Sequence, residues 1–189
     1  MDAQYGYYDD PDEHYGNNKS KNKPGSWFLG PSFGFAASNY SLNADFELLV
    51  GYRFIPRFCV GIGPIVNYVR YNEYENDVTY LGGRGLVQFN VIQDMSQVFT
   101  ISAMNIFVRG EYEQIAAKPM LVDSYGAVSK SKEWMTVNNT LVGAGVGQPI
   151  GTFGMTNIVL LYDINQHPMS SRTNPILKFE FWINLGGKK

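Results

Sequence analysis

The sequence is poor in cysteine, histidine and charge, and each shortage excludes a class of protein. Cys59 is the single cysteine, so an internal disulfide is impossible. Cysteine and histidine nowhere approach the spacing of a zinc site, and we expect no metal and no cofactor. The net charge of −2 gives no basic surface of the kind that binds nucleic acid.

Long hydrophobic runs are also missing. The chain has no stretch of about 18 consecutive apolar residues, which excludes a membrane-spanning helix but leaves barrels open, because their strands need only about ten residues. The first residues lack the charged segment and apolar core of an export signal, so export is inferred here from the barrel pattern alone.

Charged residues make up 17% of the chain, below the roughly 25% that soluble domains usually carry. Their placement says more than their number, since Lys178 is the only lysine inside a strand pattern. The other lysines fall in the terminal segments or in residues 113–134. The predicted strands therefore lack the lysine-rich outer face that a strand exposed to water usually carries.

Alternation of apolar and polar residues is what the chain has in abundance. Between Ala44 and Phe54 one face is wholly apolar and aromatic, while the other carries Asp45, Glu47 and Arg53. This period of two is typical of a strand. Similar patterns predict eight strands, over residues 26–37, 42–54, 58–70, 78–91, 98–112, 135–148, 155–165 and 175–185. The predicted fold is all-β, an eight-stranded antiparallel up-and-down transmembrane β-barrel.

Two parts are predicted. Residues 1–24 lack any apolar repeat and are interpreted as a periplasmic tail, disordered or ordered by a partner. Residues 25–189 form the barrel, with short connections at 55–57, 92–97 and 149–154, and longer ones at 71–77, 113–134 and 166–174. Short periplasmic turns and long outer loops give that rhythm. It predicts an outer-membrane protein of a Gram-negative bacterium with both termini in the periplasm.

Aromatic residues gather at both ends of the predicted strands, as in the girdles of membrane barrels. The periplasmic girdle comprises Trp27, Phe54, Phe58, Phe89, Phe99, Phe153 and Phe181. The outer girdle comprises Tyr40, Tyr68, Tyr80, Tyr112, Trp134 and Tyr162. Pro31 and Pro64 fall inside strands, where each deletes a ladder donor, and we expect a β-bulge at each. In the fifth strand Arg109 and Glu111 must face inward, which turns Val108 to the lipid.

The polar faces predict an ion-pair network inside the barrel. Arg84 is its expected centre. Glu180 is an expected partner because strands four apart in an eight-stranded barrel face each other across the lumen, and Glu47 is another because it occupies the middle of the second strand at a similar height. The other expected members are Asp45, Arg53, Arg109, Glu111, Asp163 and Lys178. Eight strands leave an interior that side chains just fill, so the network should plug the lumen. A gated channel opened by partner exchange is the alternative.

The architecture resembles the small eight-stranded outer-membrane barrels of the OmpA and OmpX type. The segments Leu161–Asn165 and Asn174–Leu177, followed by Phe179, are similar to the closing hairpin of small barrels common in Bacteroidota. The resemblance covers residues 25–185 as a pattern, and it implies a membrane location without implying a particular activity.

Two other functions have partial support in the sequence. Outer-membrane lipid A deacylases carry a His-x-Ser-Asn motif, but His167-Pro168-Met169-Ser170 is one residue too long, and residues three apart on a strand face opposite ways. Gly25-Ser26-Trp27 is similar to the Gly-x-Trp motif of lipocalins, whose apolar face points inward and whose outside is charged. Neither fits well, and we expect no enzymatic activity.

The function expected is that of a structural or interaction protein, or of an accessory subunit of a larger outer-membrane complex. Outer-membrane lipids are the expected partners, together with other outer-membrane proteins that bind the lipid face, the loop 113–134 or the N-terminal tail.

Overall fold

The computed structural model describes residues 25–37, 41–71, 76–95, 104–118, 120–122, 128–131, 133–151, 153–166 and 174–185. Eight strands close into one barrel in the order β1-β10-β9-β8-β5-β4-β3-β2, and each neighbouring pair is antiparallel. The predicted all-β, eight-stranded antiparallel barrel is confirmed. The tail predicted for residues 1–24 lies outside the described residues.

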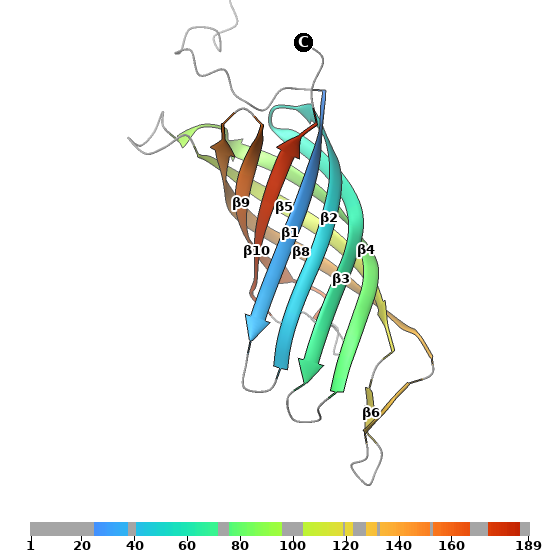
Figure 1. Cartoon of the computed structure of the whole chain (residues 1–189). Helices are drawn as coiled ribbons and strands as arrows, with labels where there is room; N and C mark the ends of the chain where they lie inside the picture. Colours follow the sequence, from blue (N-terminus) through green and yellow to red (C-terminus); the bar gives the residue numbers. More distant parts are fainter. Residues whose placement is uncertain are drawn as a thin grey trace, which may run out of the picture.

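The barrel strands are long, and Figure 1 shows them strongly tilted. Their bounds are β1 (Ser26–Ala37), β2 (Ser41–Ile55), β3 (Phe58–Tyr71), β4 (Asn76–Ile92), β5 (Asn105–Ala117), β8 (Met135–Ile150), β9 (Gly154–Asp163) and β10 (Ile176–Asn184). Two three-residue strands, β6 (Met120–Val122) and β7 (Val128–Lys130), pair only with each other.

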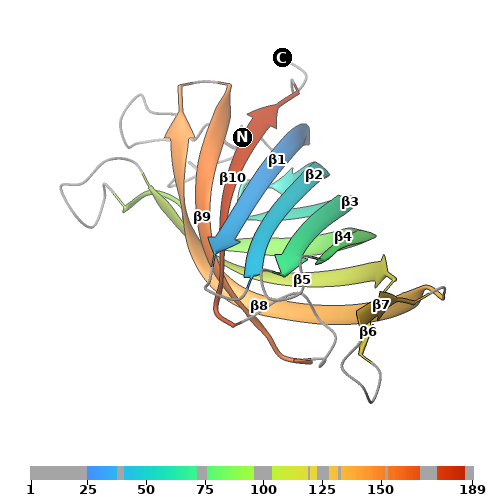
Figure 2. The same cartoon turned by 60° about the horizontal axis from the view of Figure 1, so that its bottom comes forward.

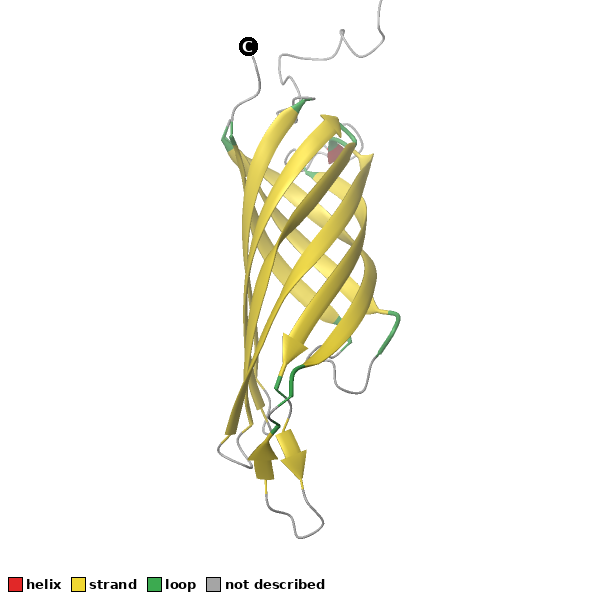
Figure 3. Ribbon diagram, turned by 90° about the vertical axis from the view of Figure 1, so that its right-hand side faces the viewer, coloured by secondary structure: helices red, strands yellow, loops and turns green. Residues whose placement is uncertain are grey.

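The two ends of the barrel differ. β1 begins and β10 ends at the same end, which we call the terminal end, while the β6–β7 hairpin extends beyond the opposite end, called the loop end (Figures 1 and 3). The loop predicted at 113–134 needs correction. Its first residues, 113–117, continue β5, and β6 and β7 lie within the remainder. The connection between β5 and β8 is therefore shorter than predicted, and it contains two short paired strands.

The ladder spirals around the barrel. One register row begins at the first residue of β1 and reaches the first residue of β10, passing through Ser26, Arg53, Cys59, Gln88, Arg109, Gly143, Leu161 and Ile176. Because β1 and β10 run antiparallel, these two first residues lie near opposite ends of the barrel (Figure 2). Such a stagger tilts the strands and, with eight strands, gives a barrel diameter at which side chains fill the lumen.

Side chains alternate between the lumen and the outer surface in every long strand. In β10, Lys178 and Glu180 are buried inside, whereas Leu177, Phe179 and Phe181 are exposed on the outside. In β5 the predicted parity, meaning which alternate residues face the lumen, is confirmed. Arg109 and Glu111 are buried inside, and Val108 is exposed. Parity read from the sequence thus gives the correct face for these two strands.

The bulges expected at the two prolines are absent from the described ladder. β1 pairs with β10 at Leu29 and again at Ser32 in an unchanged register, with only a gap at Pro31. β2 and β3 show the same kind of gap beside Pro64. Each proline therefore removes a ladder bond without inserting a residue. The register shifts lie elsewhere, between Arg53 and Ile55 in β2 and between Asn90 and Ile92 in β4.

Apolar clusters occupy both ends of the lumen. At the terminal end Phe28 stacks on Trp182, with ring centroids 4.2 Å apart, within the cluster Phe28, Leu49, Cys59, Leu86, Met155 and Trp182. At the loop end lies the cluster Ile65, Val69, Val78, Tyr80, Ile115, Ala117 and Val137. A third cluster lines one wall with Phe107, Leu141, Val159, Leu161 and Ile176. The charged side chains lie between these apolar groups.

Candidate functional site: the charged lumen and the apolar outer surface

Arg84, near the middle of β4, contacts three carboxylates from three other strands. Its Nη1 lies 2.6 Å from Glu47 Oε2 on β2 and 3.4 Å from Glu111 Oε2 on β5, and its Nη2 lies 3.1 Å from Glu180 Oε1 on β10. Glu47 and Glu180 are the two partners that the barrel geometry predicts. A planar guanidinium serves several carboxylates at once because its donors diverge at fixed angles.

Two further cations extend the cluster. Arg109 Nη1 lies 2.9 Å from Glu180 Oε2 and 3.1 Å from Glu111 Oε1. Lys178 Nζ lies 2.8 Å from Glu111 Oε2, 2.9 Å from Glu113 Oε1 and 3.2 Å from Glu47 Oε1. Glu111 therefore contacts all three cations and is the hub of the cluster.

Glu113 is a member that sequence reasoning missed. The sequence places it in the predicted loop 113–134, but β5 continues past it and the side chain is fully buried. The alternation along the strand could have identified it, since Glu113 lies two residues after Glu111 and so faces inward with Glu111 and Arg109. We call the seven residues Arg84, Arg109, Lys178, Glu47, Glu111, Glu113 and Glu180 the lumen network.

The lumen network joins β2, β4, β5 and β10 across the interior. Polar neighbours complete it, because Gln88 Oε1 accepts a hydrogen bond of 2.6 Å from Arg109 Nη2, and Trp182 Nε1 donates one of 3.1 Å to Glu180 Oε2. The apolar clusters described above lie on either side of it along the barrel. These ion pairs connect four strands across the interior and so brace the barrel at this height.

Three residues predicted to belong to the network lie apart from it. Asp45 accepts a hydrogen bond from Asn67 Nδ2, toward the loop end. Asp163 accepts one from the backbone nitrogen of Asn165 at the end of β9. Arg53 lies at the terminal mouth, next to Ser26. Their inward orientation follows from parity, but their height along the strands separates them from the seven members.

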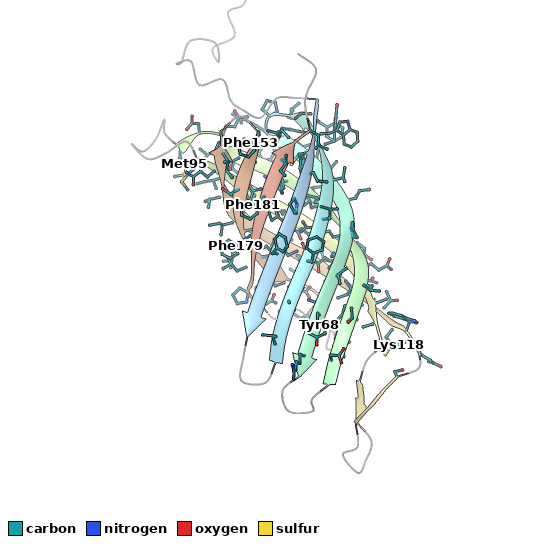
Figure 4. All side chains as sticks on the ribbon, viewed as in Figure 1. Tyr68, Met95, Lys118, Phe153, Phe179 and Phe181 are labelled. Carbon is teal, nitrogen blue, oxygen red and sulfur yellow. The ribbon has the colours of Figure 1, made fainter. Side chains whose placement is uncertain are left out.

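Large apolar side chains cover the outside of the barrel. Ile62 on β3 is the extreme case, at 72% exposed, and Figure 4 shows Phe153, Phe179 and Phe181 on the surface toward the terminal end. The predicted girdle residues that are described and exposed are Trp27, Phe54, Phe89, Phe153, Phe181, Tyr68, Tyr112, Trp134 and Tyr162, and Phe58 is half-buried. Lys118 Nζ lies 5.4 Å from the ring centroid of Trp134.

Tyr80 is a correction to the outer girdle. It is only 8% exposed and belongs to the apolar cluster that fills the loop end. Tyr80 shares its parity with Arg84 on β4, so it faces the lumen with it. Phe99 and Tyr40 lie outside the described residues.

His167 and Ser170, the two residues compared with the lipid A deacylase motif, also lie outside the described residues. Among the described residues, no group of histidine, cysteine, aspartate or glutamate side chains is arranged to hold a metal ion. The helices of the described part include none that is long and apolar enough to cross a membrane.

No family model and no curated protein matches the sequence. Among solved structures, one described as "De novo design of transmembrane beta-barrels" is similar, with 14% identity and a TM-score of 0.37. The match covers 86% of this chain and 93% of that chain.

Proposed function

We propose that this protein is a non-enzymatic barrel of a Gram-negative outer membrane, with both termini in the periplasm. The observation that carries the proposal is the distribution of polarity. Charged groups are buried in the lumen, and the outer surface exposes rows of apolar residues, among them Phe33, Phe46 and Ile62. Lipid is the solvent that such a surface requires, and a closed barrel satisfies its backbone donors internally.

The same distribution opposes the lipocalin alternative. A lipocalin keeps its apolar face inside and exposes charge, whereas here Arg84 and Glu47 are inside and Phe179 is outside. The orientation in the membrane rests on the two ends of the barrel. At the terminal end Pro56 and Arg57 alone join β2 to β3. The short connection predicted at 92–97 is wrong, because β4 ends at Ile92 and β5 begins at Asn105. The β6–β7 hairpin extends from the loop end. Short periplasmic turns and longer outer loops are the rule in such barrels.

The role we propose is structural or interactive, as an accessory subunit of a larger outer-membrane complex. One part of the lipid face suits contact with another protein. Gly83 and Gly85 on β4 and Gly110 on β5 point outward, and an added Cβ at each would find open space or only ordinary contact. Ile62 projects beside them from β3, paired in register with Gly85. Small residues allow the backbone of a membrane partner to approach closely.

Fractionation and affinity purification test this proposal in two steps. The tagged chain, exported in a Gram-negative host, should fractionate with outer membranes and leave them only in detergent. A monodisperse monomer in plain buffer would refute the membrane location. Purification from native membranes in mild detergent should then retain a specific outer-membrane protein.

The Gly83→Leu variant should lose that protein, because its side chain fills the open surface without a clash inside the barrel. The Ala144→Leu variant on β8 is the matched control, since it adds similar bulk to another part of the lipid face. Equal retention by both variants would exclude this face as the contact, and retention of no protein by the unmodified chain would contradict the accessory role.

A further inference from the structure

The terminal mouth of the barrel contains a buried cation that no described carboxylate neutralises. Arg53 is 2% exposed, yet no described carboxylate lies within ion-pair distance of it. The three cations of the lumen network each contact two or three glutamates. Arg53 is therefore the exception among the buried cations of the described lumen.

The described groups that contact Arg53 are neutral. Its Nη1 donates long hydrogen bonds to Ser26 Oγ at 3.3 Å and to Asn184 Oδ1 at 3.4 Å, and the guanidinium lies 5.5 Å from the centroid of the Phe28 ring. Taking a charge out of water without a counter-charge is expensive, and a guanidinium cannot escape the cost by losing its proton. The described residues therefore leave this site one negative charge short.

Two of the three guanidinium nitrogens of Arg53 are free to bind a negatively charged group. Nε and Nη2 donate no hydrogen bond to described groups, and neither is sealed from solvent. Arg84 differs, because its unpaired Nε is sealed inside the protein. Adjacent guanidinium nitrogens match the two oxygens of a carboxylate in a bidentate pair. The geometry at the mouth thus suits a carboxylate that approaches from outside the barrel.

We propose that Arg53 binds a carboxylate at the terminal mouth, and that the acidic segment of this chain, residues 9–13, supplies it. This segment carries Asp9, Asp10, Asp12 and Glu13. The chain enters the barrel beside the site, because the backbone nitrogen of Gly25 donates a 2.8 Å hydrogen bond to the carbonyl oxygen of Arg53. The inference does not depend on the proposed accessory role.

Chain length and charge both favour this occupant. The residues between Glu13 and Gly25 span up to about 35 to 40 Å when extended, at roughly 3.3 to 3.6 Å each, which easily permits a return to the mouth. A short flexible tether holds the acidic segment at an effective concentration in about the millimolar range. Lys19, Lys21 and Lys23 lie between, but exposed ion pairs are weak competitors for a buried one.

Nuclear magnetic resonance of the full chain in lipid nanodiscs gives the direct test. The Nε–Hε signal of Arg53 is compared between the unmodified chain and a variant in which the four acids are replaced, Asp9→Asn, Asp10→Asn, Asp12→Asn and Glu13→Gln. We expect the signal to shift in the variant and to return on addition of millimolar free peptide of residues 9–13. The Nε–Hε signal of Arg84 should not move. Glu133→Gln, which removes an exposed acid near the loop end, is the matched control and should leave Arg53 unchanged.

A double-mutant cycle separates the two parts of the proposal. Arg53→Gln should lower the urea midpoint of the unmodified chain and have a smaller effect when the four acids are already replaced. If sodium acetate shifts the Arg53 signal while the cycle shows no coupling, the carboxylate does not come from this segment and the assignment of the occupant is wrong. If neither the acid replacement, the peptide nor acetate moves the signal, Arg53 binds no carboxylate and the whole proposal fails.

Discussion

Replacing Arg84 by Met should destabilise the barrel. The loss should exceed that caused by replacing any single charged residue that lies outside the lumen network. Methionine keeps much of the volume but removes the guanidinium that contacts Glu47, Glu111 and Glu180. Breaking a buried ion pair on one side costs about 3 to 5 kcal/mol, because the remaining charges stay buried.

The structure favours the lower part of this range. Each carboxylate that loses Arg84 keeps another cation, since Glu47 and Glu111 still contact Lys178, and Glu180 still contacts Arg109. No glutamate is left without a positive neighbour, but the described network falls from three cations against four carboxylates to two against four. We therefore expect a loss of about 3 kcal/mol in the free energy of unfolding.

Urea titration in lipid vesicles, followed by tryptophan fluorescence, measures this loss. Arg57→Met is the matched control, because Arg57 is exposed in the turn between β2 and β3, and its replacement should change stability by less than about 0.5 kcal/mol. A double variant, Arg84→Met with Glu47→Gln, should recover part of the loss. Equal midpoints for Arg84→Met and Arg57→Met would refute the view that the lumen network braces the barrel.

Four further outcomes are expected. Planar bilayers should show negligible ion conductance at neutral pH, since apolar clusters lie on both sides of the lumen network, and stable open channels would contradict this plugged interior. Gly51→Val should destabilise the barrel by about 1 to 3 kcal/mol, because an added Cβ overlaps the Phe28 ring, whereas Gly83→Ala should be tolerated. The folded protein should migrate differently in gels before and after boiling, and unchanged migration would argue against a closed barrel. A chain without residues 1–24 should still fold into detergent, and failure to refold would make the tail part of the core.

Much of the fold could be predicted from the sequence because a strand has a period of two. Once Arg84 faces inward, every second residue of β4 must do so, and the same holds for Glu47 on β2 and Glu180 on β10. The barrel then brings these residues together from positions far apart in the chain. Two errors came from setting this rule aside. The prediction places Tyr80 in the girdle because it is aromatic, and Glu113 at the start of a long loop, although the alternation puts both side chains in the lumen.

Other features could not be read from the sequence. Parity fixes the face of Asp45, Arg53 and Asp163, but whether they join the network depends on the stagger between strands, which sets their height. The register shifts next to Arg53 and Asn90 lie near the ends of their strands and contain no proline, whereas Pro31 and Pro64 cause only gaps in the ladder. A proline in a strand thus shows where a ladder donor is missing but does not by itself show a change of register.

The central claim, a barrel with its apolar face toward lipid and its charges inside, is tested most directly by spin labels along β10. Single cysteines replace each residue from 177 to 183 in a Cys59→Ala background, and paramagnetic resonance in lipid bilayers measures access to oxygen and to a water-soluble nickel complex. The account predicts that labels at Leu177, Phe179, Phe181 and Ile183 meet oxygen from the lipid, while those at the alternate positions meet neither reagent. Access of the nickel complex to the outward positions, or no alternation along the strand, would contradict it.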